Sequence, residues 1–319
     1  MLETFLQIIG GLAILSFLGY IIPQFVIIFS KPLDLHSRYG GGWAFVTGGS
    51  SGIGEAFAKK VAKMGFNVAI LGQNEERLNR VEKEIKEYNP EIKTLAIKAD
   101  LSGDPVQLTE NIMKQLDGKD VSIMFFNAGI NVFEYAAQPS EDSMQQFRTN
   151  VISHQHLFHS LFPKLASRKV DLKSGYKRGA MIFTSSVVTF VSPPGMAVYA
   201  ATKSYLSGLA ESLASEADVF GIDVVSIYPG GVNTRIGERL PTSKVPTSMK
   251  SINQSPDQVA ALAVSAIGRF THLDSGFQAI ILRILSKFID SNIFIQILRI
   301  FRPLIMRNVG AETKVNAQD

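Results

Sequence analysis

The 319-residue sequence contains no cysteine. Disulfide bonds, thiolate catalysis and cysteine-ligated metal sites are therefore excluded. The charge balance is also mild, because 32 basic residues face 28 acidic ones and the formal net charge is +4. Neither a block of like charges nor a patch of interleaved aromatic and basic residues occurs. The sequence therefore gives no indication of nucleic-acid binding.

The N-terminal segment lacks charge altogether between residues 4 and 30. About 20 apolar residues suffice to span a bilayer as a helix. Glu3 precedes this segment, and Lys31 and Arg38 follow it, so the positive-inside tendency places the rest of the chain in the cytosol. A cleaved signal peptide is the alternative, but the start has no positive charge and no small-residue cleavage site follows. We predict a single-pass anchor over residues 1–30 and a linker over 31–39.

The segment 43–71 has the pattern of a nucleotide-binding βαβ unit. An apolar run at 43–46 is typical of a buried parallel strand, and a glycine-rich stretch follows from Thr47 to Gly54. Residues 55–64 have helical periodicity, and 67–71 predict a second strand. Glycines allow the backbone to approach a pyrophosphate, which also binds favourably at a helix N-terminus.

The alternation of strands and helices continues along the chain. Strands are predicted at 94–98, 121–126, 180–184 and 223–228, with helices at 75–88, 106–116, 142–165 and 199–220. This order predicts an α/β fold with a doubly wound parallel sheet, a Rossmann fold, in one domain over residues 40–240. The loops after the strands should meet at the carboxyl edge of the sheet, where such folds bind ligands.

One helix carries a candidate acid–base pair. Tyr199 and Lys203 are four residues apart and therefore lie on one helical face. A neighbouring cation favours the phenolate, so the pair predicts a lowered tyrosine pKa. Ser186 follows the strand at 180–184, where its hydroxyl can reach a substrate carbonyl. A Tyr and a Lys at this spacing also occur by chance on surface helices.

The motifs together resemble the short-chain dehydrogenase/reductase family over residues 40–240. The resemblance rests on the Thr47–Gly54 stretch, Asp100, the segment from Asn127 to Gly129, Asn150, Ser186, Tyr199, Lys203 and the segment from Pro229 to Thr234. The lead-in at 38–43 is similar to the membrane-anchored branch of 17-beta-hydroxysteroid dehydrogenases and very-long-chain 3-oxoacyl-CoA reductases.

The resemblance implies a catalytic set of Asn150, Ser186, Tyr199 and Lys203. Tyr199 would exchange the proton, Ser186 would polarise the carbonyl, Lys203 would lower the tyrosine pKa and bind the nicotinamide ribose, and Asn150 would hold a water. It also implies roles for Asp100 at the adenine amine and Asn127 at the cofactor cavity. The implied cofactor-binding residues are Thr47, Gly48, Ser50, Ser51, Gly52, Ile53, Gly54, Gln73, Asp100, Leu101, Asn127, Ala128, Gly129, Tyr199, Lys203, Pro229, Gly230, Val232 and Thr234.

The choice of cofactor depends on the end of the second strand. NAD binding needs an acid there, and the sequence has none before Glu75. Many NADP-dependent relatives carry arginine at the position of Gln73, which can hydrogen-bond a phosphate but cannot neutralise it. Arg77 on the next helix is a candidate to assist. NADP(H) is favoured, with NAD(H) as the alternative.

The C-terminal part predicts a substrate lid and following helix over 241–275 and an amphipathic segment over 276–319. Five basic residues and one acid interrupt the apolar residues between 276 and 307, so a second span is not predicted. A helix lying on the membrane surface and an ordinary core or homodimer helix are both open. His154, His156 and His159 do not share one helical face, and no metal site is predicted.

These features predict an oxidoreductase that reduces a ketone on a lipophilic substrate. Long-chain 3-oxoacyl thioesters, oxosteroids and 3-ketosphinganine-like lipids are candidates, and the resemblance favours the endoplasmic reticulum. One alternative is an NAD-linked alcohol dehydrogenase that acts on hydroxysteroids or retinol. Another is a catalytically silent, nucleotide-sensing membrane scaffold, which would have no need for the complete catalytic set.

Overall fold

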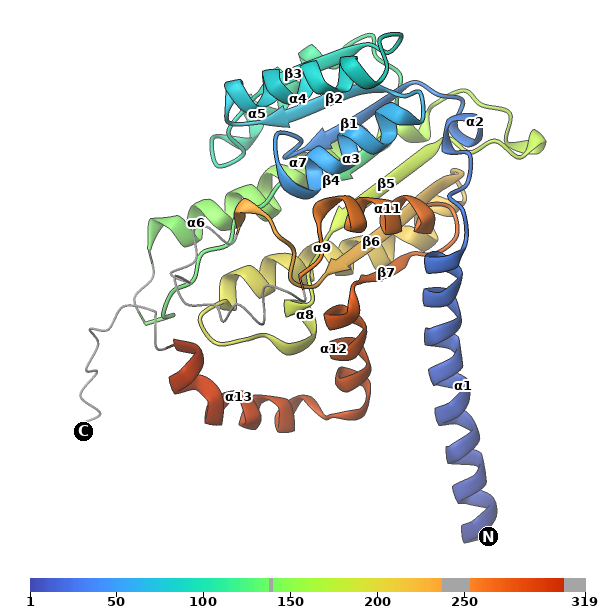
Figure 1. Cartoon of the computed structure of the whole chain (residues 1–319), viewed down its shortest axis with the longest axis vertical. Coiled ribbons are helices and arrows are strands. Elements are labelled where there is room, and N and C mark those ends of the chain that lie inside the picture. Colours follow the sequence, from blue (N-terminus) through green and yellow to red (C-terminus); the bar gives the residue numbers. More distant parts are fainter. Residues whose placement is uncertain (138–139, 237–252, 307–319) are drawn as a thin grey trace.

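The computed structural model describes residues 1–137, 140–236 and 253–306. Figure 1 shows an α/β body from which one long helix, α1 (Leu2–Phe29), extends. Most apolar side chains of α1 are exposed, whereas Gln24 and Ile27 near its end are buried. Among the described residues, α1 is the single helix long and apolar enough to cross a membrane.

The body is organised around a seven-stranded parallel sheet in the order β3-β2-β1-β4-β5-β6-β7. The predicted doubly wound fold is therefore confirmed. The strands are β1 (Trp43–Thr47), β2 (Asn67–Gly72), β3 (Thr94–Lys98), β4 (Val121–Phe126), β5 (Gly179–Thr184), β6 (Ile222–Pro229) and β7 (His272–Ser275).

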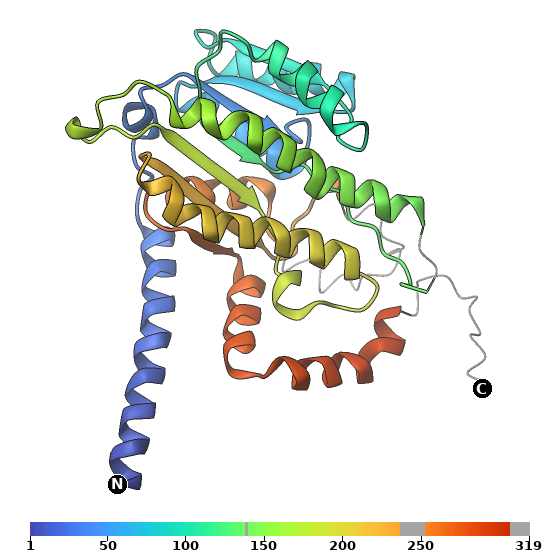
Figure 2. The ribbon, with the colours of Figure 1, turned by 180° about the vertical axis from the view of Figure 1, so that it is seen from behind.

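Two layers of helices cover the sheet, each with its own apolar core. One face packs against α3 (Gly52–Lys63), α4 (Glu75–Tyr88) and α11 (Pro256–Ala266). The other packs against α5 (Pro105–Gln115), α7 (Ser153–Ala166) and α9 (Ala197–Asp218), as Figure 2 shows from behind.

The helical region predicted at 142–165 is interrupted by a wider turn. Helix α6 (Glu141–Phe147) passes into a π-helical turn at Arg148–Ile152 before α7 begins. Such turns accommodate one extra residue and occur frequently at functional sites. Asn150 lies in the middle of this turn, so its backbone does not have the regular α-helical hydrogen-bonding pattern.

The described C-terminal part begins at residue 253. A capping box between Ser255 and Gln258 starts α11, with Pro256 at its first position. After β7 the chain forms α12 (Phe277–Phe288) and α13 (Ser291–Met306), which bend beneath the short helix α8 (Val188–Val191) in Figure 1. Residues 241–252 of the predicted lid and the tail from 307 lie outside the described residues.

A polar cluster fastens the linker to the sheet. Helix α2 (Leu35–Tyr39) places Arg38 and Tyr39 beside Asp223, at the start of β6. The Tyr39 hydroxyl donates to Asp223 Oδ2 at 2.6 Å, and Arg38 Nε donates to the same oxygen at 2.8 Å. Because all three side chains are largely shielded from water, each depends on the others to satisfy its polar atoms.

Replacing Asp223 with alanine should lower the free energy of unfolding by about 2 kcal/mol, because Arg38 and Tyr39 both lose their acceptor. The loss is smaller than for a fully buried pair, since both charged side chains retain some exposure. Denaturant unfolding in detergent micelles measures it. Glu110→Ala, on the exposed face of α5, is the control and should change stability by no more than about 0.5 kcal/mol. Equal stability of the two variants would contradict a structural role for the cluster.

Candidate active site

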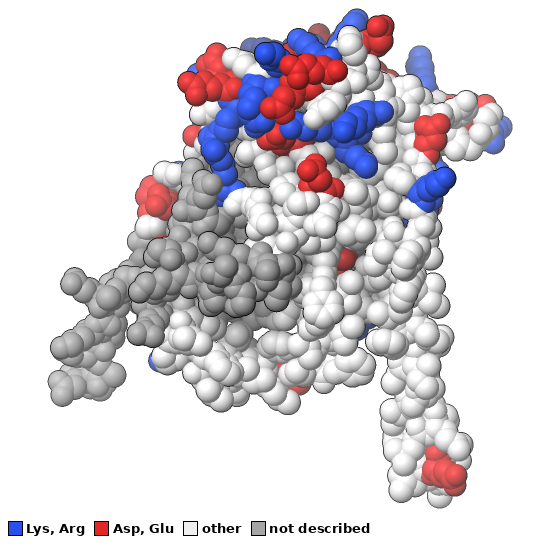
Figure 3. Space-filling model, in the orientation of Figure 1, with Lys and Arg blue, Asp and Glu red and all other residues white. Residues whose placement is uncertain are grey.

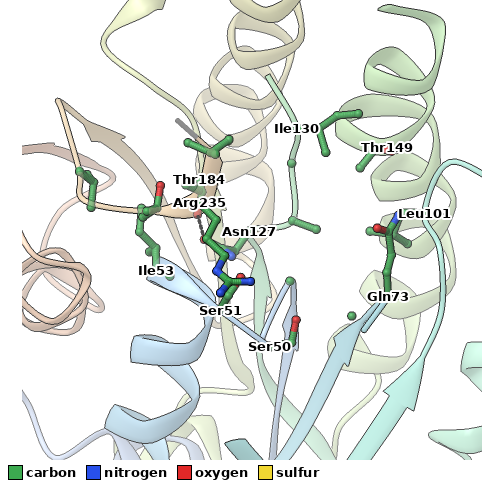
Figure 4. Close-up of a pocket in the computed structure, with 18 of the residues that line it drawn as sticks. Ser50, Ser51, Ile53, Gln73, Leu101, Asn127, Ile130, Thr149, Thr184 and Arg235 are labelled. Atoms are coloured by element: carbon green, nitrogen blue, oxygen red, sulfur yellow. Dashed lines mark hydrogen bonds between the residues drawn. The ribbon is translucent and has the colours of Figure 1, made fainter. Parts of the chain in front are cut away.

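A cavity of about 480 Å³ lies at the carboxyl edge of the sheet. It is lined by residues from the loops that follow β1, β2, β3, β4, β5 and β6, as the topology requires. In Figure 4, Gln73 and Leu101 lie on one side and Ser51, Ile53 and Arg235 on the other. The predicted residues that line it are Gly48, Ser50, Ser51, Gly52, Ile53, Gln73, Leu101, Asn127, Ala128, Gly129, Ser186, Tyr199, Lys203, Pro229, Gly230, Val232 and Thr234.

The turn between β1 and α3 has no room for side chains at two of its glycines. A Cβ atom on Gly54 would lie 2.2 Å from the carbonyl oxygen of Gly48. Gly48 has a φ of 68°, and a Cβ there would lie 2.9 Å from Cα of Ala128. The backbone therefore forms a bare cradle at the N-terminus of α3, which suits a pyrophosphate group.

Thr47 and Asn127 support the cavity by joining strand ends. The buried Thr47 hydroxyl accepts hydrogen bonds from the backbone N–H groups of Asn127 at 2.9 Å and Ala128 at 3.0 Å. The Asn127 side chain donates to the Thr47 carbonyl at 3.2 Å and accepts from the Thr184 hydroxyl at 3.2 Å. The ends of β1, β4 and β5 are thereby fixed relative to one another.

Asp100 is exposed and does not line the cavity, whereas its neighbour Leu101 does. The Gln73 amide donates to Asp100 Oδ1 at 2.6 Å, and the same oxygen accepts from the backbone and hydroxyl of Ser102. Gln73 therefore contacts a carboxylate in this structure, rather than presenting a free amide to a phosphate as the sequence suggests.

Tyr199 lies in the cavity wall with only 7% of its surface exposed. Burial raises the pKa of its phenol to about 12, and a hydrogen bond with Ser186 acts in the opposite direction. The expectation of a lowered pKa was wrong for this geometry, because the loss of solvent outweighs the stabilisation of the phenolate. The phenol is thus protonated at neutral pH.

Lys203 is buried near Tyr199, but its ammonium group binds a backbone carbonyl and not the Tyr199 hydroxyl. Its ammonium donates to the carbonyl oxygen of Thr184 at 2.8 Å and lies 5.7 Å from the Tyr199 ring centroid. Burial lowers the lysine pKa to about 8. Its charge is therefore retained at neutral pH but is lost far more readily than that of a solvent-exposed lysine.

Asn150 is fully buried and is not among the residues that line the cavity. Its side-chain oxygen accepts from the backbone N–H of Ile130 at 2.9 Å, and its amide donates to the Ile130 carbonyl at 3.0 Å and to the Thr202 hydroxyl at 3.1 Å. The π-helical turn thus connects the β4 loop to α9 next to Lys203. No pattern in the sequence indicates this turn.

His154 is a core residue that adjoins the same network. One ring nitrogen lies 3.1 Å from the Asn150 carbonyl and the other 3.2 Å from the Thr47 hydroxyl. Burial lowers its pKa to about 4, so the ring is neutral at physiological pH. It bridges the two segments that carry the glycine turn and the π-helical turn.

Three polar residues at the cavity suit a dinucleotide with its phosphate groups. Arg77 lines the cavity, and its Nε atom is buried without a hydrogen-bond partner among the described residues. The Thr149 hydroxyl is in the same situation, and Arg235 extends toward Ser51 and Asn127 in Figure 4. Thr149 and Arg235 belong to none of the motifs recognised in the sequence. The sequence alone therefore does not predict that they line the cavity.

The parallel sheet, the bare glycine turn and the group of Ser186, Tyr199 and Lys203 at one cavity suit a dinucleotide-dependent oxidoreductase. The family model for short chain dehydrogenase matches residues 42–244. The chain therefore belongs to the short chain dehydrogenase family and is an NAD(P)-dependent oxidoreductase that acts on alcohol or carbonyl groups.

Comparison with individual proteins gives more distant similarities. The chain is 30% identical to the 17-beta-hydroxysteroid dehydrogenase type 3 of Danio rerio over 244 residues, which is 73% of this chain and 75% of that protein. It is 27% identical to the very-long-chain 3-oxoacyl-CoA reductase of Phaeosphaeria nodorum over 249 residues, or 76% and 68%. A solved 7beta-hydroxysteroid dehydrogenase is 25% identical, with a TM-score of 0.72 over 84% of this chain and 100% of its own.

The pKa values of Tyr199 and Lys203 predict the pH dependence of carbonyl reduction. Below about pH 8 the phenol can donate a proton and the ammonium can stabilise the phenolate that forms. Above it the ammonium is lost, so kcat/KM should fall about tenfold per pH unit. A pH–rate profile between pH 6 and 10 measures this. Lys203→Arg keeps its charge, so any activity that it retains should lack the decline. A wild-type profile that is flat to pH 10 would contradict the lowered lysine pKa.

Proposed function

We propose that this protein reduces the keto group of a lipophilic substrate with NADPH while α1 anchors it in a membrane. The observation that carries the proposal is a shared cavity. Ser186, Tyr199 and Lys203 line the same space as the glycine turn at the start of α3. A proton donor and a dinucleotide cradle at one site suit hydride transfer to a carbonyl group.

Each side chain at the site has a separate role in the reduction. A bound nicotinamide dinucleotide supplies the hydride. Ser186 donates a hydrogen bond to the carbonyl oxygen and polarises it. Tyr199 gives its phenolic proton to that oxygen, and its raised pKa ensures that the proton is present. The Lys203 ammonium, held by the Thr184 carbonyl, stabilises the negative charge left on Tyr199 and binds the ribose.

The charges around the cavity favour NADPH over NADH. Arg77, Lys203 and Arg235 line it, whereas none of the described lining residues is an aspartate or glutamate. Arg77 belongs to α4, the helix that follows β2, where the adenosine ribose of a dinucleotide binds in this fold. Its unpaired Nε is a donor suited to the additional phosphate of NADPH.

The substrate class is inferred from the relatives and from α1. The relatives named above are a hydroxysteroid dehydrogenase and a reductase of very-long-chain 3-oxoacyl-CoA. Both names describe a carbonyl or alcohol group on a large apolar body. A membrane anchor is consistent with such substrates, which partition into lipid. We place the catalytic domain on the cytosolic side of the membrane, since Lys31 and Arg38 follow α1. The resemblance to the membrane-anchored branch favours the endoplasmic reticulum as that membrane.

Tyr199→Phe should lower kcat for ketone reduction at least about 100-fold, because it removes the proton donor and little else. Oxidation of NADPH is followed by absorbance with a panel of 3-oxoacyl-CoA, oxosteroid and 3-ketosphinganine substrates. Tyr205→Phe is the matched control, since it makes the same change on the same helix where the hydroxyl contacts Gln155. Binding of NADPH without turnover by the wild type would refute the proposed activity.

Arg77→Gln should raise KM for NADPH about tenfold and leave KM for NADH nearly unchanged, because only NADPH carries the extra phosphate. Initial rates with each cofactor at a saturating ketone concentration provide the comparison. The control is Arg80→Gln on the same helix, where Arg80 pairs with Glu55 and Glu84 outside the cavity. An equal rise in KM for both cofactors would show that Arg77 does not recognise the extra phosphate.

A further inference from the structure

Helix α13 exposes an apolar stripe to the surroundings. Ile295 is exposed on the opposite side of the helix, but the larger set of exposed apolar side chains is Ile293, Ile297, Ile300, Phe301 and Leu304. Steps of four, three, one and three residues place them on one helical face. Ile300 is 74% exposed, whereas Met306 at the end of the helix is buried against the body. The stripe thus faces away from the protein and does not contribute to its apolar core.

The position of α13 relative to α1 indicates what covers the stripe. Figures 1 and 2 both show α1 extending away from the body and α13 running across its direction at the same end of the molecule. When α1 crosses a bilayer, a helix with this orientation lies parallel to the membrane surface. An exposed apolar face on such a helix is suited to insertion among lipid headgroups.

A polar cluster fixes the position of α1 along its axis relative to β7 and α12. The Tyr20 hydroxyl donates to Asp274 Oδ2 at 3.0 Å, and Arg283 Nε of α12 donates to the same oxygen at 3.1 Å. Lys287 Nζ lies 4.9 Å from the Tyr20 ring centroid. Only 3% of Asp274 is exposed, so this carboxylate is enclosed by protein. These contacts hold Tyr20 level with α12.

Tyr20 is also where a membrane-spanning segment would end. Residues 2–19 form eighteen helical positions, or about 27 Å, close to the hydrocarbon thickness of about 30 Å. Tyrosine and lysine side chains are favoured at the membrane interface. The membrane surface therefore falls at Tyr20 and Lys287, next to the beginning of α13.

The charge distribution agrees with this orientation. In Figure 3 the charged side chains crowd onto the part of the body remote from α1, and the part with α1 and α13 is mostly uncharged. The charges that α12 and α13 do carry are Arg283, Lys287, Arg299 and Arg302, against Asp290 alone in that segment. A basic amphipathic segment favours an anionic leaflet.

The same helices touch the segment that joins Ser186 to Tyr199. The Arg283 guanidinium lies 3.8 Å from the centroid of the Phe190 ring in α8. A Cβ atom on Gly195 would lie 2.9 Å from the Met306 sulfur, which shows how closely α13 packs there. A bilayer against α13 would therefore adjoin the side of the cavity where the carbonyl substrate binds.

We propose that α12 and α13 form a second membrane contact that lies flat on the leaflet surface and holds the substrate side of the active site against the lipid. The contact itself depends only on α1 crossing the bilayer. Delivery of substrate from the lipid phase rests on the proposed reductase function.

The absence of cysteine allows the contact to be tested with single spin labels. Ile300→Cys and Leu304→Cys are labelled in the full-length protein in nanodiscs that contain anionic lipid. Accessibility to oxygen and to an aqueous nickel reagent then reports depth. Both labels should favour oxygen at least about fivefold more than a label at Val106→Cys, because apolar depth enriches oxygen and excludes nickel. Val106 is the control because it is also aliphatic, 51% exposed and on the remote helix α5.

Two results would overturn the proposal. Nickel accessibility at residues 300 and 304 equal to that at 106 would place α13 in water. Protection from both reagents together with dipolar coupling between labels would show that a second copy of the chain covers the stripe.

A kinetic comparison tests the delivery of substrate. The triple substitution Ile300→Ser, Phe301→Ser and Leu304→Ser should raise KM for a long-chain membrane-dissolved ketone about tenfold, since it removes the apolar contact. It should leave kcat/KM for a short water-soluble 3-oxo ester unchanged. An equal loss with both substrates would refute lipid delivery. If wild-type protein reduces no ketone, the proposed function fails, and the spin-label depths still decide the membrane contact.

Discussion

The buried hydroxyl of Thr47 connects the parts of the candidate active site. It ends β1 and accepts two backbone N–H groups at the end of β4, which fixes the glycine turn against the Asn127 loop. That loop continues to Ile130, which is held by Asn150, and the Asn150 amide reaches Thr202 on α9. Lys203 is the next residue. Hydrogen bonds and the short backbone segment between them thus link the glycine turn to the helix that carries Tyr199 and Lys203.

Burial dominates the electrostatics of this site. Loss of solvent raises the pKa of Tyr199 and lowers those of Lys203 and His154. All three shifts favour the neutral form, as expected when charge is removed from water. In such surroundings a charge brought by a cofactor or a developing oxyanion interacts more strongly than it would in water. The carbonyl of Thr184 is therefore important, because it holds the Lys203 ammonium 5.7 Å from the Tyr199 ring centroid.

The sheet and its loops could be predicted because short apolar runs and glycine turns are local signals. Strand β7 is not predicted from the sequence, because His272-Leu-Asp-Ser275 contains only one apolar residue. Its burial results from packing in the tertiary structure and not from an apolar pattern. The π-helical turn at Asn150 has no sequence signature within the periodic segment 142–165. The sign of the Tyr199 pKa shift was wrong because spacing reveals a neighbouring lysine but not the amount of solvent that the fold removes. Partners such as Asp274 for Tyr20 are 254 residues apart and follow only from the tertiary structure.

The orientation of the catalytic body relative to α1 is a property of the fold and not of a flexible tether. Gln24 and Ile27 of α1 are buried against the body, and Tyr20 is joined to β7 through Asp274. The linker is fixed as well, because Arg38 and Tyr39 bind Asp223 at the start of β6. For a helix that crosses a bilayer, these contacts convert membrane insertion into a defined orientation of the active site. The exposed apolar side chains of α1 and α13 at one end, and the charges at the other, suit a protein with one side in lipid and one in water.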